Sequence, residues 1–142
     1  MTTNPDMKTA TVTWQGEGLT FAAEVSSGYK FTMDAKAGEQ GGSPMELLLA
    51  GVAGCTAIDV VMMLQKMREP VSGVQVTIEG TRADDHPRVY TQATLHYTIR
   101  GEVNPDSVVR AIKLSKEKYC SASIMFAQAG VAIETDFTIE AG

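Results

Sequence analysis

The two cysteines of this 142-residue chain, Cys55 and Cys120, are the side chains best suited to chemistry. A cysteine thiolate attacks electrophiles, and two thiols can join in a disulfide. Free cysteines are also often small buried hydrophobic residues without reactivity. Because the two lie far apart in the sequence, a disulfide between them would be a long-range link. Composition and spacing alone leave both interpretations open.

The sequence around each cysteine bears on its reactivity. Cys120 lies just before an apolar helical segment, where free backbone N–H groups favour a thiolate. Asp59 follows Cys55 by one helical turn, and its charge would raise rather than lower the pKa of that thiol. Asp59 also fits a hydrogen-bonded buried carboxylate or a residue of a dimer contact.

Several other kinds of site are poorly supported. His86 and His96 lie in or near a predicted hairpin, and neither a C-x-x-C nor an H-x-x-x-H spacing occurs. We therefore expect no metal and no bound cofactor. Phosphate-binding and serine-nucleophile motifs are missing as well. The net charge of -5 argues against a nucleic-acid partner.

One apolar segment, residues 47–64, reaches the lower limit of length for a membrane-spanning helix. Asp59 lies near its middle, and Gly51 and Gly54 interrupt it. We interpret the segment as a helix buried in protein rather than in a membrane. The chain also opens without a basic and apolar leader. These features predict a cytoplasmic protein, in a compartment that keeps thiols reduced.

Three strands and a long helix are predicted in the first half of the chain, after a mobile lead-in over residues 1–8. Turn residues separate strands at residues 9–14, 19–25 and 29–34. Ser43 and Glu46 form a capping box around Pro44, which starts a helix there. That helix extends to about Arg68, because Pro70 disfavours helical geometry in the residue before it.

The second half of the chain predicts two strands, two helices and a last strand. Alternating apolar and polar residues indicate strands at residues 74–79 and 92–99, joined by a hairpin loop. Asn104 and Pro105 start a second helix, and Gly130 ends a short third one that follows Cys120. The last strand covers residues 131–139.

This order, βββ-α-ββ-α-α-β, predicts an α+β fold of antiparallel sheets packed on helices, with residues 1–142 as a single domain. The first helix would be about 37 Å long at about 1.5 Å per residue, more than a domain of this size comfortably encloses. A second copy is the simplest cover for its apolar circumference, and Gly51 and Gly54 would let another backbone approach. We expect an intimate homodimer.

Two stretches of the sequence resemble the OsmC/Ohr family. Residues 43–55, SPMELLLAGVAGC, resemble the helix that carries the first family cysteine, and residues 118–123, KYCSAS, resemble the second cysteine motif. The strand pair from residues 86–90, HPRVY, to residues 99–101, IRG, is also similar. The resemblance covers nearly the whole chain. It implies an intertwined homodimer with long central helices and strands of both chains around them.

The resemblance also implies an activity, a thiol-dependent peroxidase that reduces organic hydroperoxides in oxidative-stress defence. Cys55 would be the peroxidatic cysteine, oxidised to a sulfenic acid, and Cys120 the resolving one. An external dithiol, similar to dihydrolipoamide, would then reduce their disulfide. The implied partners are thus a second copy, a small hydroperoxide and a dithiol reductant.

The chain departs from the family at the groups that activate the first cysteine. The peroxidases of the family place a glutamate and an arginine beside it. Met45 stands at the position of that glutamate and Glu46 comes one later, so Glu46 is a candidate catalytic residue as well as a capping residue. No arginine precedes Arg68. The cations that remain as candidates are Lys30, Lys36, Arg82 and Arg88.

Two alternatives to a peroxidase stay open. One is a redox sensor, or another thiol enzyme, that uses the same pair of cysteines. The other is a binding protein whose interface pocket, lined by Met and Leu, holds an apolar ligand while the thiols stay inert.

Overall fold

The computed structural model describes residues 6–36 and 38–142 of the chain. Two compact units are present, Met1–Leu48 and Leu49–Gly142, and their boundary falls in the first turns of a long helix. The order βββ-α-ββ-α-α-β is confirmed, with a π-helical turn added after the second helix. Residues 1–5 of the expected lead-in lie outside the described residues.

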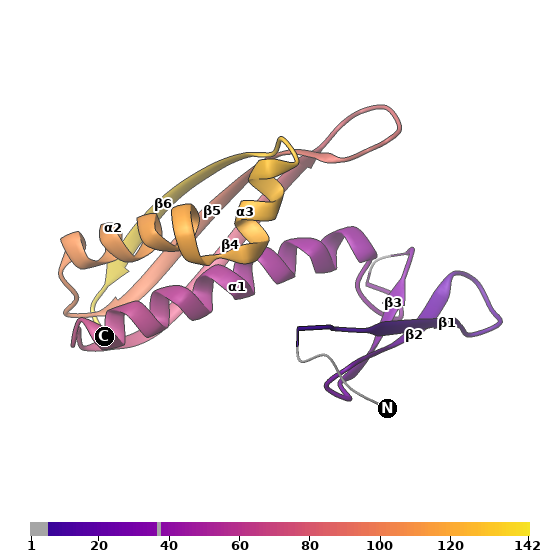
Figure 1. Cartoon of the computed structure of the whole chain (residues 1–142), viewed down its shortest axis with the longest axis horizontal. Coiled ribbons are helices and arrows are strands. Elements are labelled where there is room, and N and C mark those ends of the chain that lie inside the picture. Colours follow the sequence, from indigo (N-terminus) through magenta and orange to yellow (C-terminus); the bar gives the residue numbers. More distant parts are fainter. Residues whose placement is uncertain (1–5, 37) are drawn as a thin grey trace. The chain divides into compact units, whose positions relative to one another are not determined.

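The first unit carries a three-stranded antiparallel sheet in the order β1-β2-β3 (Figure 1). Its strands are β1 (Ala10–Trp14), β2 (Thr20–Val25) and β3 (Lys30–Asp34), all within one residue of the predicted starts. Alternation gives the sheet an apolar face, on which Val12 lies opposite Ala23 and Ala23 opposite Phe31. Trp14 belongs to the same face and is 55% exposed, so much of this face remains uncovered.

The long helix α1 (Pro44–Lys66) begins at the predicted capping box. The Glu46 N–H donates to Ser43 Oγ at 3.2 Å, and Glu46 Oε1 accepts from the Ser43 N–H at 3.0 Å. The pair thus satisfies two of the backbone donors that every helix leaves free at its start.

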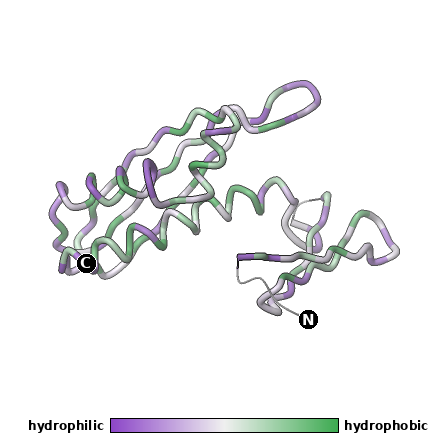
Figure 2. The backbone as a smooth tube through the Cα atoms, in the orientation of Figure 1, coloured by the Kyte–Doolittle hydropathy of each residue, from purple (hydrophilic) through white to green (hydrophobic). Residues whose placement is uncertain are grey.

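Helix α1 is hydrophobic along most of its length (Figure 2). Its buried residues recur every fourth position, at Val52, Thr56, Val60 and Leu64. Ile58, on another side, is 61% exposed. The expected burial therefore holds for one stripe of α1 within this chain. By length and composition alone, α1 would also be long and apolar enough to cross a membrane.

The second unit is built on a mixed sheet in the order β4-β5-β6. Strands β4 (Val71–Arg82) and β5 (Tyr90–Gly101) form the predicted antiparallel hairpin. Strand β6 (Ala132–Glu140) pairs with β5 in parallel, so the prediction of purely antiparallel sheets is wrong for this pair. The long helical connection between β5 and β6 crosses over the sheet, which is the geometry that a parallel neighbour requires.

That crossover contains three helical segments on the sheet (Figure 1). Helix α2 (Pro105–Leu114) starts at the predicted cap, where the Asn104 side chain accepts from the Asp106 N–H. A π-helical turn, η1 (Ser115–Tyr119), and helix α3 (Ser121–Gln128) follow. One core joins the buried stripe of α1 to the inward side chains of β5 and α2, among them Tyr97 and Val108.

Candidate thiol site

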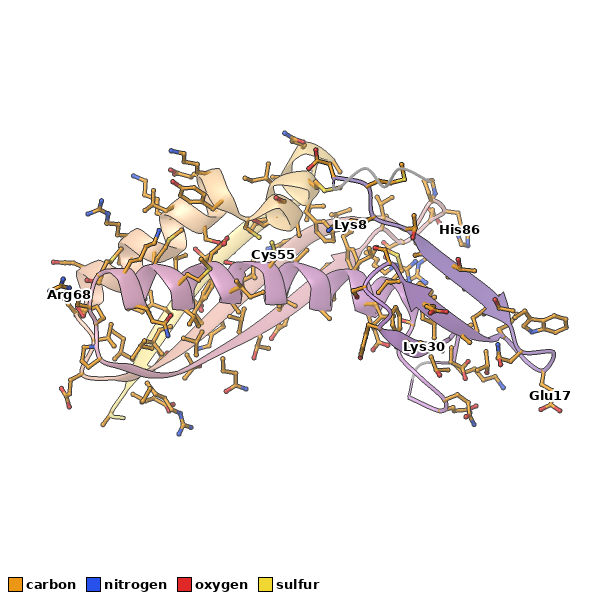
Figure 3. The ribbon with its side chains drawn as sticks, turned by 60° about the horizontal axis from the view of Figure 1, so that its bottom comes forward. Lys8, Glu17, Lys30, Cys55, Arg68 and His86 are labelled. Carbon is orange, nitrogen blue, oxygen red and sulfur yellow. The ribbon has the colours of Figure 1, made fainter. Side chains whose placement is uncertain are left out.

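The two cysteines lie on elements that the crossover brings together. Cys55 is near the middle of α1 and is half-buried (Figure 3). Cys120 lies between η1 and α3, where it is the N-cap of α3 and 0% exposed. The two thiols are near enough to interact, because Cys55 contributes to the raised pKa of Cys120. The structure thus brings together the two sequence-predicted cysteines, and both are free.

Hydrogen bonds hold Cys120 firmly. The Cys120 N–H donates to the Ser115 carbonyl at 2.7 Å, which closes the π-helical turn. At the start of α3, the Ser123 N–H donates to Cys120 Sγ at 3.4 Å, and Ser123 Oγ donates to the Cys120 carbonyl at 3.3 Å. The thiol therefore takes the place of a capping side chain at the start of α3. The π-helical turn that precedes it is of a type that is frequent at functional sites.

Burial raises the pKa of the Cys120 thiol above its ordinary value. The hydrogen bonds from Ser123 act in the opposite direction, and the neighbouring Cys55 thiol adds to the rise. The expectation that the helix start favours a Cys120 thiolate is therefore wrong in its net effect. A thiol removed from water loses more stabilisation of its charged form than one short helix restores.

Sequence reasoning missed a row of hydroxyl groups beside the thiols. Thr56 Oγ1 lies 2.8 Å from Tyr97 Oη and 2.8 Å from Ser115 Oγ. Ser115 Oγ donates to Asp59 Oδ2 at 2.9 Å, so Asp59 is a hydrogen-bonded carboxylate, one of the roles considered for it. The one available signal was a polar residue, Thr56, at a core position of α1. Burial raises the pKa of Tyr97 above its ordinary value, and the neighbouring Asp59 adds to the rise.

The other predicted site residues have local partners. Glu46 Oε1 accepts from the Ser43 hydroxyl at 3.1 Å as well as from its N–H, so one carboxylate oxygen serves the capping box. Arg82 Nε donates to the Arg88 carbonyl, and Arg88 Nε donates to the Ala83 carbonyl, both within the β4–β5 hairpin. Lys30 and Lys36 are exposed residues of the first unit.

A cavity of about 510 Å³ opens between the second half of α1 and the segment from α2 to η1. Asp59 and Tyr119, which lie at its wall, are close in sequence to Cys55 and Cys120. Met and Leu side chains form its apolar lining, and two cationic residues, Lys66 and Arg110, also line it. The apolar lining residues are Met62, Met63, Met67 and Leu114.

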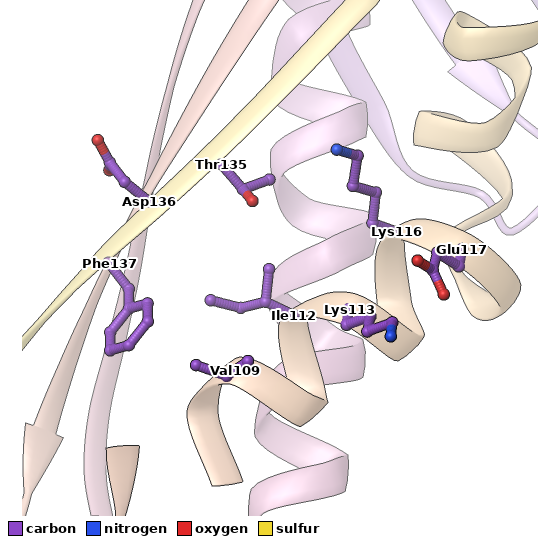
Figure 4. Close-up of a pocket in the computed structure, with 8 residues that line it drawn as sticks. All are labelled: Val109, Ile112, Lys113, Lys116, Glu117, Thr135, Asp136 and Phe137. Atoms are coloured by element: carbon purple, nitrogen blue, oxygen red, sulfur yellow. The ribbon is translucent and has the colours of Figure 1, made fainter. Parts of the chain in front are cut away.

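A second cavity, of about 460 Å³, lies between α2 and β6 (Figure 4). Val109, Ile112 and Phe137 line its apolar part. Lys116, at its edge, donates to the Ile133 carbonyl at 3.0 Å. Because neither cysteine lines this cavity, it offers no contact with the thiol pair.

The two histidines of the sequence have ordinary surroundings in the described part of the chain. His96 pairs with Asp136 on the outer face of the sheet and also contacts Thr138 Oγ1. Within residues 6–36 and 38–142, no group of three or more His, Cys, Asp or Glu side chains is arranged to hold a metal ion.

Comparisons with known proteins agree on one family. The family model of OsmC-like protein matches residues 36–136. Protein YhfA of Escherichia coli (strain K12) is 42% identical over 121 residues, 84% of this chain and 90% of that protein. A crystal structure of a hypothetical protein from Aquifex aeolicus VF5 has a TM-score of 0.85 at 31% identity, with 96% of this chain and 98% of that chain covered.

An organic hydroperoxide resistance protein OsmC from Legionella pneumophila has the same fold. Its TM-score is 0.71 at 15% identity, and the match covers 96% of this chain and 99% of that chain.

The different environments of the two thiols predict a difference in alkylation. Iodoacetamide should modify Cys55 at least about 10-fold faster than Cys120 at pH 7.5, because Cys120 is buried and its pKa is raised. The labelling rate of Cys120 should continue to rise above about pH 9.5, where an ordinary thiol, with a pKa of about 8.5, is almost fully ionised and its rate levels off. Mass spectrometry of the two peptides measures both rates, and equal rates for the two cysteines would contradict the assigned environments.

Proposed function

The chain belongs to the OsmC-like protein family, and from this premise we propose that it reduces organic hydroperoxides with Cys55 and Cys120 as its reactive pair. The family includes organic hydroperoxide resistance proteins, which supports a role in redox chemistry or peroxide stress. One observation carries the proposal. Two cysteines from distant parts of the sequence have interacting thiols in the folded chain.

The environments of the thiols favour one order of events. Cys55 is half-buried and therefore within reach of a small peroxide, whereas Cys120 is enclosed and its raised pKa keeps it protonated. The Cys55 thiolate attacks the terminal peroxide oxygen, the O–O bond breaks, and the products are a Cys55 sulfenic acid and, after protonation, an alcohol. Cys55 is thus the peroxidatic cysteine of this proposal.

Cys120 then acts as the resolving cysteine. Its sulfur attacks the sulfur of the Cys55 sulfenic acid, an S–S bond forms, and the thiol proton leaves with the hydroxyl group as water. An external dithiol restores both thiols by exchange and is itself oxidised to a disulfide. We place this cycle in the cytoplasm, where dithiol reductants keep cysteines reduced.

We also propose that the working form is a homodimer. Within the second unit, exposed small and apolar residues follow one side of α1 at helical spacing, namely Gly51, Gly54, Ile58 and Met62. A side-chain carbon added at Gly51 or Gly54 would meet no atom within 4 Å, which leaves room for another backbone. The uncovered apolar face of the β1-β2-β3 sheet is a second surface that a partner copy would bury.

A second candidate function is the binding of an amphipathic organic anion. The cavity beside α1 offers methionines, which adapt to varied apolar shapes, together with Lys66 and Arg110 for an anionic group. Met62 belongs both to this cavity and to the exposed side of α1, so a second copy would form part of the wall. In this function the thiols stay unreactive.

The first prediction concerns turnover of tert-butyl hydroperoxide with dihydrolipoamide as reductant. Cys55→Ser should lower the rate at least about 100-fold, because a hydroxyl is a far weaker nucleophile than a thiolate. Cys120→Ser should consume about one equivalent of peroxide if Cys55 stops at the sulfenic acid, or about two if it reaches the sulfinic acid, and then stop, and mass spectrometry of the Cys55 peptide distinguishes the two. Normal turnover in Cys55→Ser would refute the peroxidase. A Cys55–Cys120 disulfide that forms without turnover would indicate a redox sensor.

The second prediction concerns assembly. In sedimentation velocity the native chain should have twice the 15.2 kDa mass of one copy. Ile58→Glu should dissociate it, because burial of a charge against an apolar surface costs several kcal/mol, on the order of the free energy that holds a dimer. Gln75→Glu adds the same charge on the exposed face of β4 and should leave the mass unchanged. A monomeric native chain, or a dimeric Ile58→Glu variant, would contradict this assembly.

The third prediction separates the second candidate from the first. Isothermal titration of the reduced protein with dodecanoate should show binding, and Arg110→Gln should weaken it about 10-fold by loss of one charge-assisted contact. Lys113→Gln removes the same charge from a residue outside this cavity and should leave the affinity unchanged. If dodecanoate does not bind at millimolar concentration, or if the two variants behave alike, the candidate fails.

A further inference from the structure

The buried stripe of α1 contains one polar residue. Thr56 occupies the same face as Val52, Val60 and Leu64 and is only 1% exposed. A hydroxyl in such a position must have hydrogen-bond partners in the protein, since water does not reach it. Its partners come from two different elements, Tyr97 of β5 and Ser115 of η1. Thr56 therefore ties α1 both to the sheet and to the turn before Cys120.

The direction of every bond in this row follows from its last member. Ser115 Oγ donates to the Asp59 carboxylate, and a hydroxyl has only one proton to give. Ser115 must therefore accept from Thr56, and Thr56 must accept from Tyr97. The result is one aligned chain, Tyr97 to Thr56 to Ser115 to Asp59, with distances of 2.8, 2.8 and 2.9 Å. We call it the hydroxyl chain.

Both cysteines are attached to the hydroxyl chain through the backbone. Cys55 directly precedes Thr56 in α1. Cys120 donates its N–H to the carbonyl of Ser115 at 2.7 Å, in the bond that closes the π-helical turn. Ser115 is thus held to α1 by its side chain and holds Cys120 by its main chain. The hydroxyl chain spans the gap between the segments that carry the two sulfur atoms.

We propose that Thr56 and Ser115 are positioning residues, which hold the Cys120 thiol where it can reach Cys55 through the hydroxyl chain. The inference rests on the proposed function, because it concerns the disulfide of that cycle. A polar network with one possible bond direction has one favoured geometry, whereas apolar packing alone tolerates small shifts of a helix against a turn. The effect is a high effective concentration of one thiol at the other.

The thermodynamic consequence is a shift of the reduction potential. When the hydroxyl chain is broken, the thiols are less well aligned and the disulfide becomes less stable relative to the dithiol. A loss of effective concentration of about 10-fold makes the potential about 30 mV less negative. A residue that only fills space would change the stability of both redox forms without this shift.

The test uses two substitutions at one position. Thr56→Val keeps the shape and removes the hydroxyl, and Thr56→Ser keeps the hydroxyl and removes a methyl group. The proteins are equilibrated with mixtures of reduced and oxidised dithiothreitol, quenched in acid, and the Cys55–Cys120 disulfide is quantified by mass spectrometry. Thr56→Val should lose effective concentration at least about 10-fold, and Thr56→Ser should stay within about 3-fold of the native chain.

A second pair of variants guards against misfolding of Thr56→Val. Ser115→Ala should give the same loss, whereas Ser121→Ala, an exposed serine next to Cys120, should leave the potential unchanged. Unchanged potentials in both Thr56→Val and Ser115→Ala, or an equal shift in Thr56→Val and Thr56→Ser, would overturn the inference. If the native chain forms no Cys55–Cys120 disulfide in any mixture, the proposed function itself fails, and the two failures remain distinguishable.

Discussion

Packing of one stripe of α1 against β5 determines where both thiols lie. The stripe recurs every fourth residue and meets the inward side chains of β5, with α2 closing the same core. That contact sets the rotation of α1 and therefore the side on which Cys55 emerges. It also buries the Thr56 hydroxyl, which must therefore form hydrogen bonds within the protein and forms them with Tyr97 and Ser115. The apolar core and the polar chain inside it are thus two parts of one arrangement.

The sequence was sufficient for features that depend on a few neighbouring residues. The capping box at Ser43, the cap at Asn104 and the alternation of β5 are local patterns, and all are confirmed. The parallel pairing of β6 could not be predicted, because the alternation of a strand does not encode the direction of its neighbour. The π-helical turn could not be predicted either, because no characteristic amino-acid composition marks such a turn. The raised pKa of Cys120 depends on burial by segments distant in sequence.

The candidate site, too, could be predicted from the sequence only in part. The two cysteines could be singled out by type and by their resemblance to family motifs, but their interaction is a product of the whole second unit. The arginine and the glutamate that the resemblance leads one to expect beside the first cysteine have no direct counterpart in the sequence. Among the described residues, Arg82 and Arg88 bond within the β4–β5 hairpin, while Lys66 and Arg110 stand at the cavity beside α1.

The large separation of the cysteines in the sequence has a consequence for chain entropy. A disulfide between them would close a loop of roughly 65 residues, which in the chain-entropy description removes about 4 kcal/mol of freedom from the unfolded state. The β4–β5 hairpin and helix α2 both lie inside that loop. An oxidised chain would therefore resist unfolding more than a reduced one, apart from any strain in the bond. Each turn of the proposed cycle would alternate the molecule between a more and a less tightly constrained fold.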